Sequence, residues 1–266
     1  MKKLFILKIL LSAIFVMFMS ISCEETETEE NDAPQIPPES TMLMDFSDFS
    51  NPEDTTDKAN ETYIAWGHSA FNVLVWNAVI TVGLAVPVTS FTEAFNHQAE
   101  YHADENYWTW TYGFNANGQH QAELKGYLTG DTVTWEMKID DFLWYYGNSH
   151  LDRTGGYWIL NESKQQPTPL LRIEWARPDT TVASISYTNI APEESSHGAE
   201  NGGYIAYGIT EEEFNRYYDI YNKGQDNLIE IQWNFEDKHG RVKDYRRFLD
   251  ENWHCWDTTL QDTDCN

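Results

Sequence analysis

Residues 62–92 contain no Asp, Glu, Lys or Arg, although the chain carries a formal net charge of −26. Over residues 63–88 of this stretch, apolar side chains recur at intervals of three, four or seven, as they do along one face of an α-helix. The residues with this spacing are Trp66, Ala70, Val73, Ile80 and Leu84. His68, Ser69 and Asn72 form only a narrow polar face. We therefore predict one long helix that is mostly buried.

The ends of this helix also follow from local sequence. Thr56 or Asn60 is suited to cap its N-terminus, whereas Gly83 and Pro87 end it. A second short helix is expected over residues 91–98. A membrane-spanning helix is the alternative interpretation of the stretch, because it is long and apolar. His68, Asn72 and Asn77 would be costly in lipid, which favours a core helix of a soluble domain.

The N-terminus has the layout of a secretory signal. Residues 4–19 are apolar apart from Lys8 and Ser12, and two further lysines precede them. Residues 1–22 are therefore predicted to be a signal peptide and are left out of the fold. Cys23 follows the small residue Ser22, which resembles the lipobox of bacterial lipoproteins. The resemblance implies that the Cys23 thiol is acylated, with palmitate among the acyl chains, and anchors the protein to a membrane. The alternative is an ordinary signal peptide with an incidental cysteine.

The residues after Cys23 are acidic and then proline-rich. The run over residues 24–32 resembles the export signal that sends lipoproteins of Bacteroidota to the outer face of the outer membrane. A solvated, self-repelling tether is the alternative, and both interpretations can hold together. Pro34, Pro37 and Pro38 favour an extended segment. We predict a tether over residues 23–41 and a single β-rich domain over residues 42–266.

The net charge limits which partners the protein can bind, and the cysteines bear on the compartment in which it folds. A formal net charge of −26 repels phosphate backbones, so nucleic acid is excluded as an expected partner. Cys255 and Cys265 lie near the C-terminus, and an exported protein meets an oxidising compartment. We expect them to form a disulfide whose short loop contributes about 2–3 kcal/mol.

From residue 106 onward the sequence alternates with period two, as β-strands do. Residues 115–118 and 130–131 carry hairpin turn residues. Strands are predicted over residues 106–114, 119–128, 133–139, 157–160, 170–175, 182–187, 204–207, 229–235 and 241–248. About eight to ten short strands in hairpin order describe an antiparallel meander. The predicted fold class is α+β, mainly antiparallel β: a curved meander sheet or open barrel packed around the long N-terminal helix.

Tryptophans dominate one face of these strands. They either fill the core or line a pocket for a glycan or an apolar ligand. Trp144, Tyr145 and Tyr146 fall in a predicted loop and are candidates for exposed contacts. The candidate ligand-binding residues are Trp108, Trp110, Trp135, Trp144, Tyr146, Trp158, Trp175 and Trp233.

Catalytic and metal-binding patterns are weak. Three glutamates fall on the face opposite a tryptophan of the same predicted strand, which is the solvent face: Glu136, Glu174 and Glu230. A glycoside hydrolase would need such carboxylates in a cleft. Residues 67–71 begin like a serine-hydrolase elbow but lack its second glycine. His97 and His102 are five positions apart, which does not bring them to one helical face. No cofactor, metal site or catalytic residue is predicted.

Taken together, the lipobox, acidic tether, aromatic β-domain and terminal cysteines resemble an uncharacterised family of Bacteroidota outer-membrane lipoproteins. The resemblance implies a lipid-anchored protein of the outer membrane, at the cell surface or on the periplasmic face. We expect a non-enzymatic protein that binds a glycan, an apolar ligand or an outer-membrane protein. An accessory subunit of an envelope complex and a glycan hydrolase are the alternatives.

Overall fold

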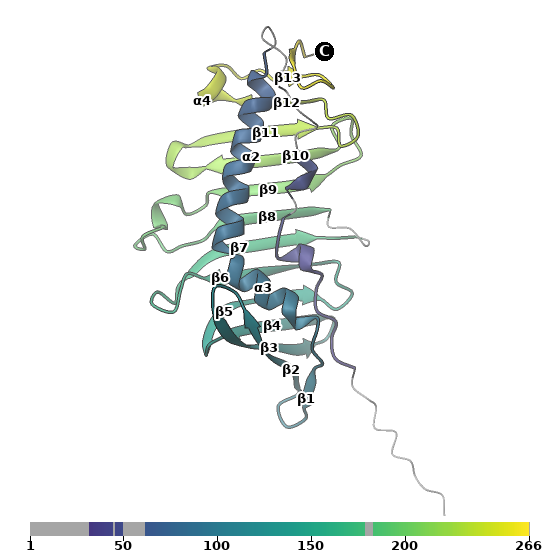
Figure 1. Cartoon of the computed structure of the whole chain (residues 1–266), viewed down its shortest axis with the longest axis vertical. Helices are drawn as coiled ribbons and strands as arrows, with labels where there is room; N and C mark the ends of the chain where they lie inside the picture. Colours follow the sequence, from purple (N-terminus) through teal and green to yellow (C-terminus); the bar gives the residue numbers. More distant parts are fainter. Residues whose placement is uncertain (1–31, 45, 50–61, 179–182, 266) are drawn as a thin grey trace, which may run out of the picture. The chain divides into compact units, whose positions relative to one another are not determined.

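The computed structural model describes residues 32–44, 46–49, 62–178 and 183–265. They form an open antiparallel sheet of fourteen strands in sequence order, with few helices (Figure 1). The predicted signal peptide, Cys23, almost all of the acidic run and the expected helix start near Thr56 or Asn60 lie outside the described residues. The sheet matches the predicted antiparallel meander, and its first and last strands do not pair to close a barrel.

The elements follow one another along the chain. The helices are η1 (Glu39–Thr41), η2 (Ser47–Phe49), α2 (Ile64–Gly83), α3 (Ala85–Ala94), η3 (Gly198–Glu200), η4 (Lys223–Gln225) and α4 (Tyr245–Phe248). The strands are β1 (Glu100–His102), β2 (Tyr107–Asn115), β3 (Gln119–Thr129), β4 (Thr132–Ile139), β5 (Phe142–His150), β6 (Gly155–Asn161), β7 (Pro169–Ala176), β8 (Ser184–Asn189), β9 (Tyr204–Ile209), β10 (Arg216–Asn222), β11 (Asn227–Trp233), β12 (Gly240–Asp244), β13 (His254–Trp256) and β14 (Asp262–Thr263).

Strand alternation places large apolar side chains on one face of the sheet. In β4, for example, Val133, Trp135, Met137 and Ile139 are buried, while the residues between them are partly exposed. The β2–β3 turn has the predicted hairpin chemistry, because Asn117 and Gly118 both adopt positive φ. The face that carries the buried residues is called the inner face below.

Helix α2 crosses the strands on this inner face (Figure 1). The continuous helix expected over residues 63–88 is instead two helices, because α3 is bent by 66° relative to α2. Neither α2 nor any other helix of the described residues has, by itself, the length and apolar composition of a membrane span; α2 and α3 meet that criterion only as a bent pair. Among the residues of α2, only Ala65, Ser69, Val73 and Ile80 are buried. The predicted burial of this helix therefore holds for one side only.

The N-terminus of α2 is capped by a residue from the other end of the chain. The Asp262 carboxylate accepts hydrogen bonds from the backbone N–H of Ile64 at 3.0 Å and of Ala65 at 2.9 Å. The backbone N–H of Asp262 donates to the Thr62 carbonyl at 2.8 Å. Residue 262 belongs to β14, which pairs with β13 beside the Cys255–Cys265 disulfide. The C-terminal segment thus fixes where α2 begins.

The segment before α2 also packs on the inner face. The compact unit begins at Ala33, and Ile36, Thr41 and Met42 are buried. The hydroxyl of Tyr187 in β8 accepts from the Met44 N–H at 2.6 Å and donates to the Met42 carbonyl at 3.1 Å. The tether predicted to reach residue 41 is thus shorter, because its proline-rich half lies against the sheet rather than in solvent.

Candidate functional site

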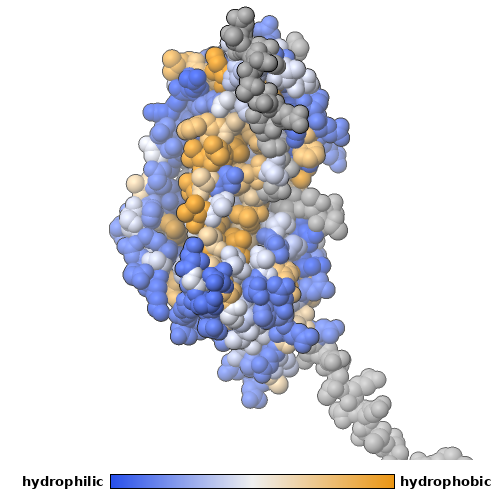
Figure 2. Space-filling view, viewed as in Figure 1, coloured by the Kyte–Doolittle hydropathy of each residue, from blue (hydrophilic) through white to orange (hydrophobic). Residues whose placement is uncertain are grey.

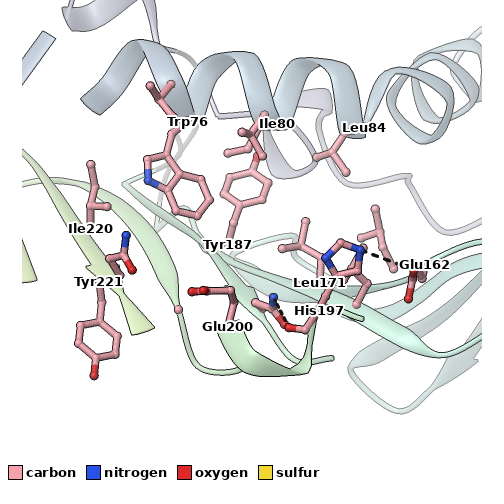
Figure 3. A pocket seen from close by; sticks show the side chains of 18 of the residues that line it. Trp76, Ile80, Leu84, Glu162, Leu171, Tyr187, His197, Glu200, Ile220 and Tyr221 are labelled. Carbon is pink, nitrogen blue, oxygen red and sulfur yellow. Dashed lines mark hydrogen bonds and ion pairs between the residues drawn. The ribbon is translucent and has the colours of Figure 1, made fainter. Parts of the chain in front are cut away.

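A groove separates part of α2 from the sheet. It has a volume of about 480 Å³, and we call it the α2 groove. Trp76, Ile80 and Leu84 point from the helix toward the sheet, and Leu171 and Tyr187 point back from it (Figure 3). Other apolar lining residues are Val75, Val79, Trp144, Leu160, Leu170, Ile220 and Ile229. The site is therefore a concave, largely apolar surface built by two layers of the fold.

The groove follows from how α2 rests on the sheet. Its backbone comes closest to the sheet near its N-terminus, at β12, β13 and β14, and it meets α3 at its other end. Between these two supports, side chains rather than backbone bridge the distance to the strands. Trp76 bridges it only partly, because its indole remains partly exposed.

Polar groups border the groove along one edge of the sheet. In an antiparallel meander, the C-terminal ends of β6, β8 and β10 lie at the same edge. Glu162 follows β6, and His197 and Glu200 lie between β8 and β9. The Nε2 atom of His197 is 3.6 Å from Glu162 Oε1, and Glu200 Oε2 accepts from the Gly224 N–H at 3.1 Å. This edge of the α2 groove is called the polar edge.

Six of the predicted tryptophans are core residues. Trp108, Trp110, Trp135, Trp158, Trp175 and Trp233 are each at most 4% exposed. Other side chains occupy the space around them: Phe91 of α3 packs edge-on against Trp158, with ring centroids 5.3 Å apart. Their indoles therefore offer no surface to a ligand, and the core-packing alternative describes them.

Trp144 and Tyr146 lie in β5, not in the predicted loop. Met137 pairs with Tyr145 and Lys138 with Leu143, so Trp144 is the extra residue of a β-bulge. This irregularity allows Trp144 to line the α2 groove. Tyr146 pairs with Glu136 and lies on the opposite, outer face. Of the predicted ligand-binding set, only Trp144 contributes to the groove.

The outer face carries the glutamates considered for catalysis. Glu174 accepts from Arg172 at 2.9 Å, and this hydrogen bond holds the pKa of Glu174 below its ordinary value. Glu230 lies 3.3 Å from Lys243. Asp219 pairs across the strands with Glu230; burial, and then the Glu230 charge, raise the pKa of Asp219. None of these carboxylates lines the α2 groove.

The serine and histidine residues considered for catalysis or metal binding form hydrogen bonds within the protein. Ser69 is buried and donates to the Ala65 carbonyl at 2.9 Å, so its hydroxyl is not presented to a substrate. His97 interacts with Glu93, and His102 with the hydroxyl of Thr109. Within the described ranges, no group of three or more His, Cys, Asp or Glu side chains is arranged to hold a metal ion.

The solvent side of α2 is a second notable surface. Phe71, Leu74, Val75, Val79 and Val82 recur along one helical face and are 43–79% exposed; we call them the α2 stripe. Figure 2 shows apolar surface gathered along α2 with hydrophilic surface on both sides. Val75 and Val79 belong to both the stripe and the groove. Contiguous exposed apolar surface of this kind commonly marks an interaction site.

Sequence reasoning missed most of the groove. Trp76 lies in the uncharged stretch of residues 62–92, and this stretch was the only sequence feature that pointed to any part of the groove. Leu171 and His197 follow no motif, because the topology alone brings them together. Comparison with protein-family models, curated proteins and solved structures finds no match to this chain.

Proposed function

We propose that this protein is a non-enzymatic, lipid-anchored envelope protein that binds a small apolar or amphipathic ligand in the α2 groove. The observation that carries the proposal is the groove itself. Its volume of about 480 Å³ lies within the range of small-molecule sites, and its walls are mostly aliphatic and aromatic. An apolar ligand fits these walls better than a glycan, because a glycan needs many polar partners that they do not supply.

The chemistry of binding is the burial of apolar surface. Each methylene group transferred from water into the groove contributes about 0.8 kcal/mol. The aromatic ring of Trp76, which is partly exposed, adds contact area on the helix side of the groove (Figure 3). Strand residues and a packed helix already hold the side chains that line the groove in place. Ordering the site therefore offsets little of the free energy gained by burying apolar surface.

Membrane attachment is a separate part of the proposal. It is supported by the sequence around Cys23 and by the acidic run after it. Replacing Cys23→Ala should abolish incorporation of an alkyne-labelled palmitate and release the protein from the membrane fraction. Retention of the label in this variant would contradict acylation at Cys23. Protection of the wild-type protein from protease added to intact cells would place it on the periplasmic face instead of the cell surface.

Binding can be tested with a neutral probe and two matched variants. Dodecanol should bind the purified protein in calorimetric titrations below its solubility limit. Val79→Asp places a charge beside the groove, whereas Val82→Asp makes the same change on the same helix outside it. We expect Val79→Asp to weaken binding about tenfold or more, because the ligand must then desolvate a carboxylate. Equal binding by both variants, or none by the wild type, would refute the proposed site.

The α2 stripe supports a second candidate function, that of an accessory subunit in an envelope complex. Phe71 and Leu74 are each 64% exposed, and neither lines the groove. Phe71→Asp should then abolish co-purification of an outer-membrane protein after mild detergent extraction and leave dodecanol binding unchanged. Co-purification that survives Phe71→Asp and Leu74→Asp would remove the support for this function.

A further inference from the structure

The α2 groove is asymmetric in polarity. Its interior is apolar, whereas its carboxylates and its one histidine all lie on the polar edge: Glu162, His197 and Glu200 (Figure 3). A ligand that fills both parts must carry an apolar tail and one polar head. The charge and hydrogen-bonding state of the polar edge therefore select the head group.

Several donors near the polar edge are already engaged. Asn161 Nδ2 donates to the Leu143 carbonyl at 2.8 Å, and Asn189 Nδ2 donates to the His197 carbonyl at 3.3 Å. The Tyr221 hydroxyl points away from the groove and donates to Asp226 at 2.8 Å. An anionic head group, which needs donors, finds few of them here.

Acceptors remain in excess at the same edge. The edge carries two carboxylates and one histidine, and the described lining residues include no Lys or Arg. Glu162 is paired with His197. Glu200 is exposed, and its Oε2 accepts one backbone N–H, so its carboxylate can accept further hydrogen bonds. A positively charged group that donates several hydrogen bonds complements this arrangement, and a carboxylate or phosphate is repelled by it.

We infer that the ligand of the α2 groove is an amphiphile with a cationic amine head group, whose tail lies beneath α2 and whose ammonium lies beside Glu200. This inference rests on the proposed ligand-binding function and specifies its ligand class. Fatty acids and acidic phospholipids are excluded as preferred ligands by the same charges.

The test compares three head groups on one alkyl chain: dodecylamine, dodecanoate and dodecanol. Each is titrated at neutral pH, the two charged probes below their micellar concentrations and dodecanol below its solubility limit. We expect dodecylamine to bind at least about tenfold more tightly than dodecanoate, with a difference that shrinks as salt is added. Equal affinities for the amine and the carboxylate would overturn the inference while leaving the proposed function intact. Absence of binding by all three would instead reject the proposed function.

Variants locate the charge effect. Glu200→Gln keeps an oxygen that can accept from the Gly224 N–H but removes the negative charge. It should weaken dodecylamine binding about fivefold and leave dodecanol binding unchanged. Glu211→Gln is the matched control, since Glu211 is exposed in the β9–β10 turn at the opposite edge of the sheet. Unchanged amine affinity in Glu200→Gln, or an equal loss in Glu211→Gln, would refute the assignment.

Discussion

The cap on α2 yields a prediction about how the groove is held together. Asp262 accepts two backbone N–H groups from the first turn of α2, although 197 residues separate it from Ala65. Replacing Asp262→Ala leaves both donors without this acceptor. The helix should then fray at the end where its backbone lies closest to the sheet.

The magnitude follows from the contacts that are lost. Loss of a helix cap costs about 1 kcal/mol, with a range of about 0.5–2. A negative charge beside a helix N-terminus adds about 0.3–1 kcal/mol. Because Asp262 bonds to two N–H groups but is only partly buried, we expect Asp262→Ala to lower the unfolding free energy by about 1–2 kcal/mol. Asp262→Asn keeps an acceptor oxygen and should cost about half as much.

Urea unfolding followed by tryptophan fluorescence measures this loss, and hydrogen exchange at Ile64 and Ala65 localises it. Asp264→Ala is the control, because Asp264 is an exposed aspartate two residues further along the chain. Its unfolding free energy should stay within about 0.5 kcal/mol of the wild type. Equal effects of Asp262→Ala and Asp264→Ala would refute the role of Asp262 as the cap of α2.

Three further predictions concern stability. Burial raises the pKa of Asp244, but hydrogen bonds led by that from His68 lower it more, to a net value below the ordinary 3.8. Its contribution is therefore present above pH 3.8 and lost as pH falls through the folded-state pKa, so acid titration should destabilise Asp244→Asn less steeply than the wild type. Reducing the C-terminal disulfide should lower the unfolding free energy in urea by about 2–3 kcal/mol. Phe91→Ala should cost about 3–5 kcal/mol by the same assay, because its ring is fully buried, whereas Phe95→Ala at an exposed position should cost far less.

Strand periodicity was predictable because it depends on neighbouring residues. Buried and more exposed residues alternate throughout β4, in the second half of β2 and in the middle of β3, and the turns between these strands carry Gly or Asn at positive φ. β5 escaped prediction because the bulge at Trp144 interrupts its alternation and aromatic residues occupy both faces. β10 also escaped prediction, because Tyr217 and Tyr218 lie on opposite faces of the strand and so give no polar–apolar alternation.

Burial of α2 was harder to predict, because it depends on what the rest of the chain places over the helix. The absence of charge in residues 62–92 indicated a helix that is mostly buried. The described sheet covers one side only, which leaves Phe71 and Val82 exposed. Composition likewise suggested a free tether up to residue 41, although Ile36 and Thr41 are buried against the sheet.

The groove was beyond sequence reasoning for a related physical reason. Trp76 and Glu200 are far apart in the chain, and only the order of strands and the path of α2 bring them to one site. The tryptophans with the strongest sequence signal proved to be core residues. A large aromatic side chain on a strand satisfies packing and binding patterns equally, so its residue type could not separate the two.

Photoaffinity labelling tests the central claim of a ligand site beneath α2 most directly. A dodecanol analogue with a diazirine at the end of its chain would be irradiated with the protein, and the labelled peptides mapped by mass spectrometry. We predict labels on Trp76 or Leu171, which line the groove and are partly exposed, and we predict that excess dodecanol removes them. Labels confined to Phe71 and Val82 on the solvent side of α2, or labels that dodecanol does not displace, would contradict the account.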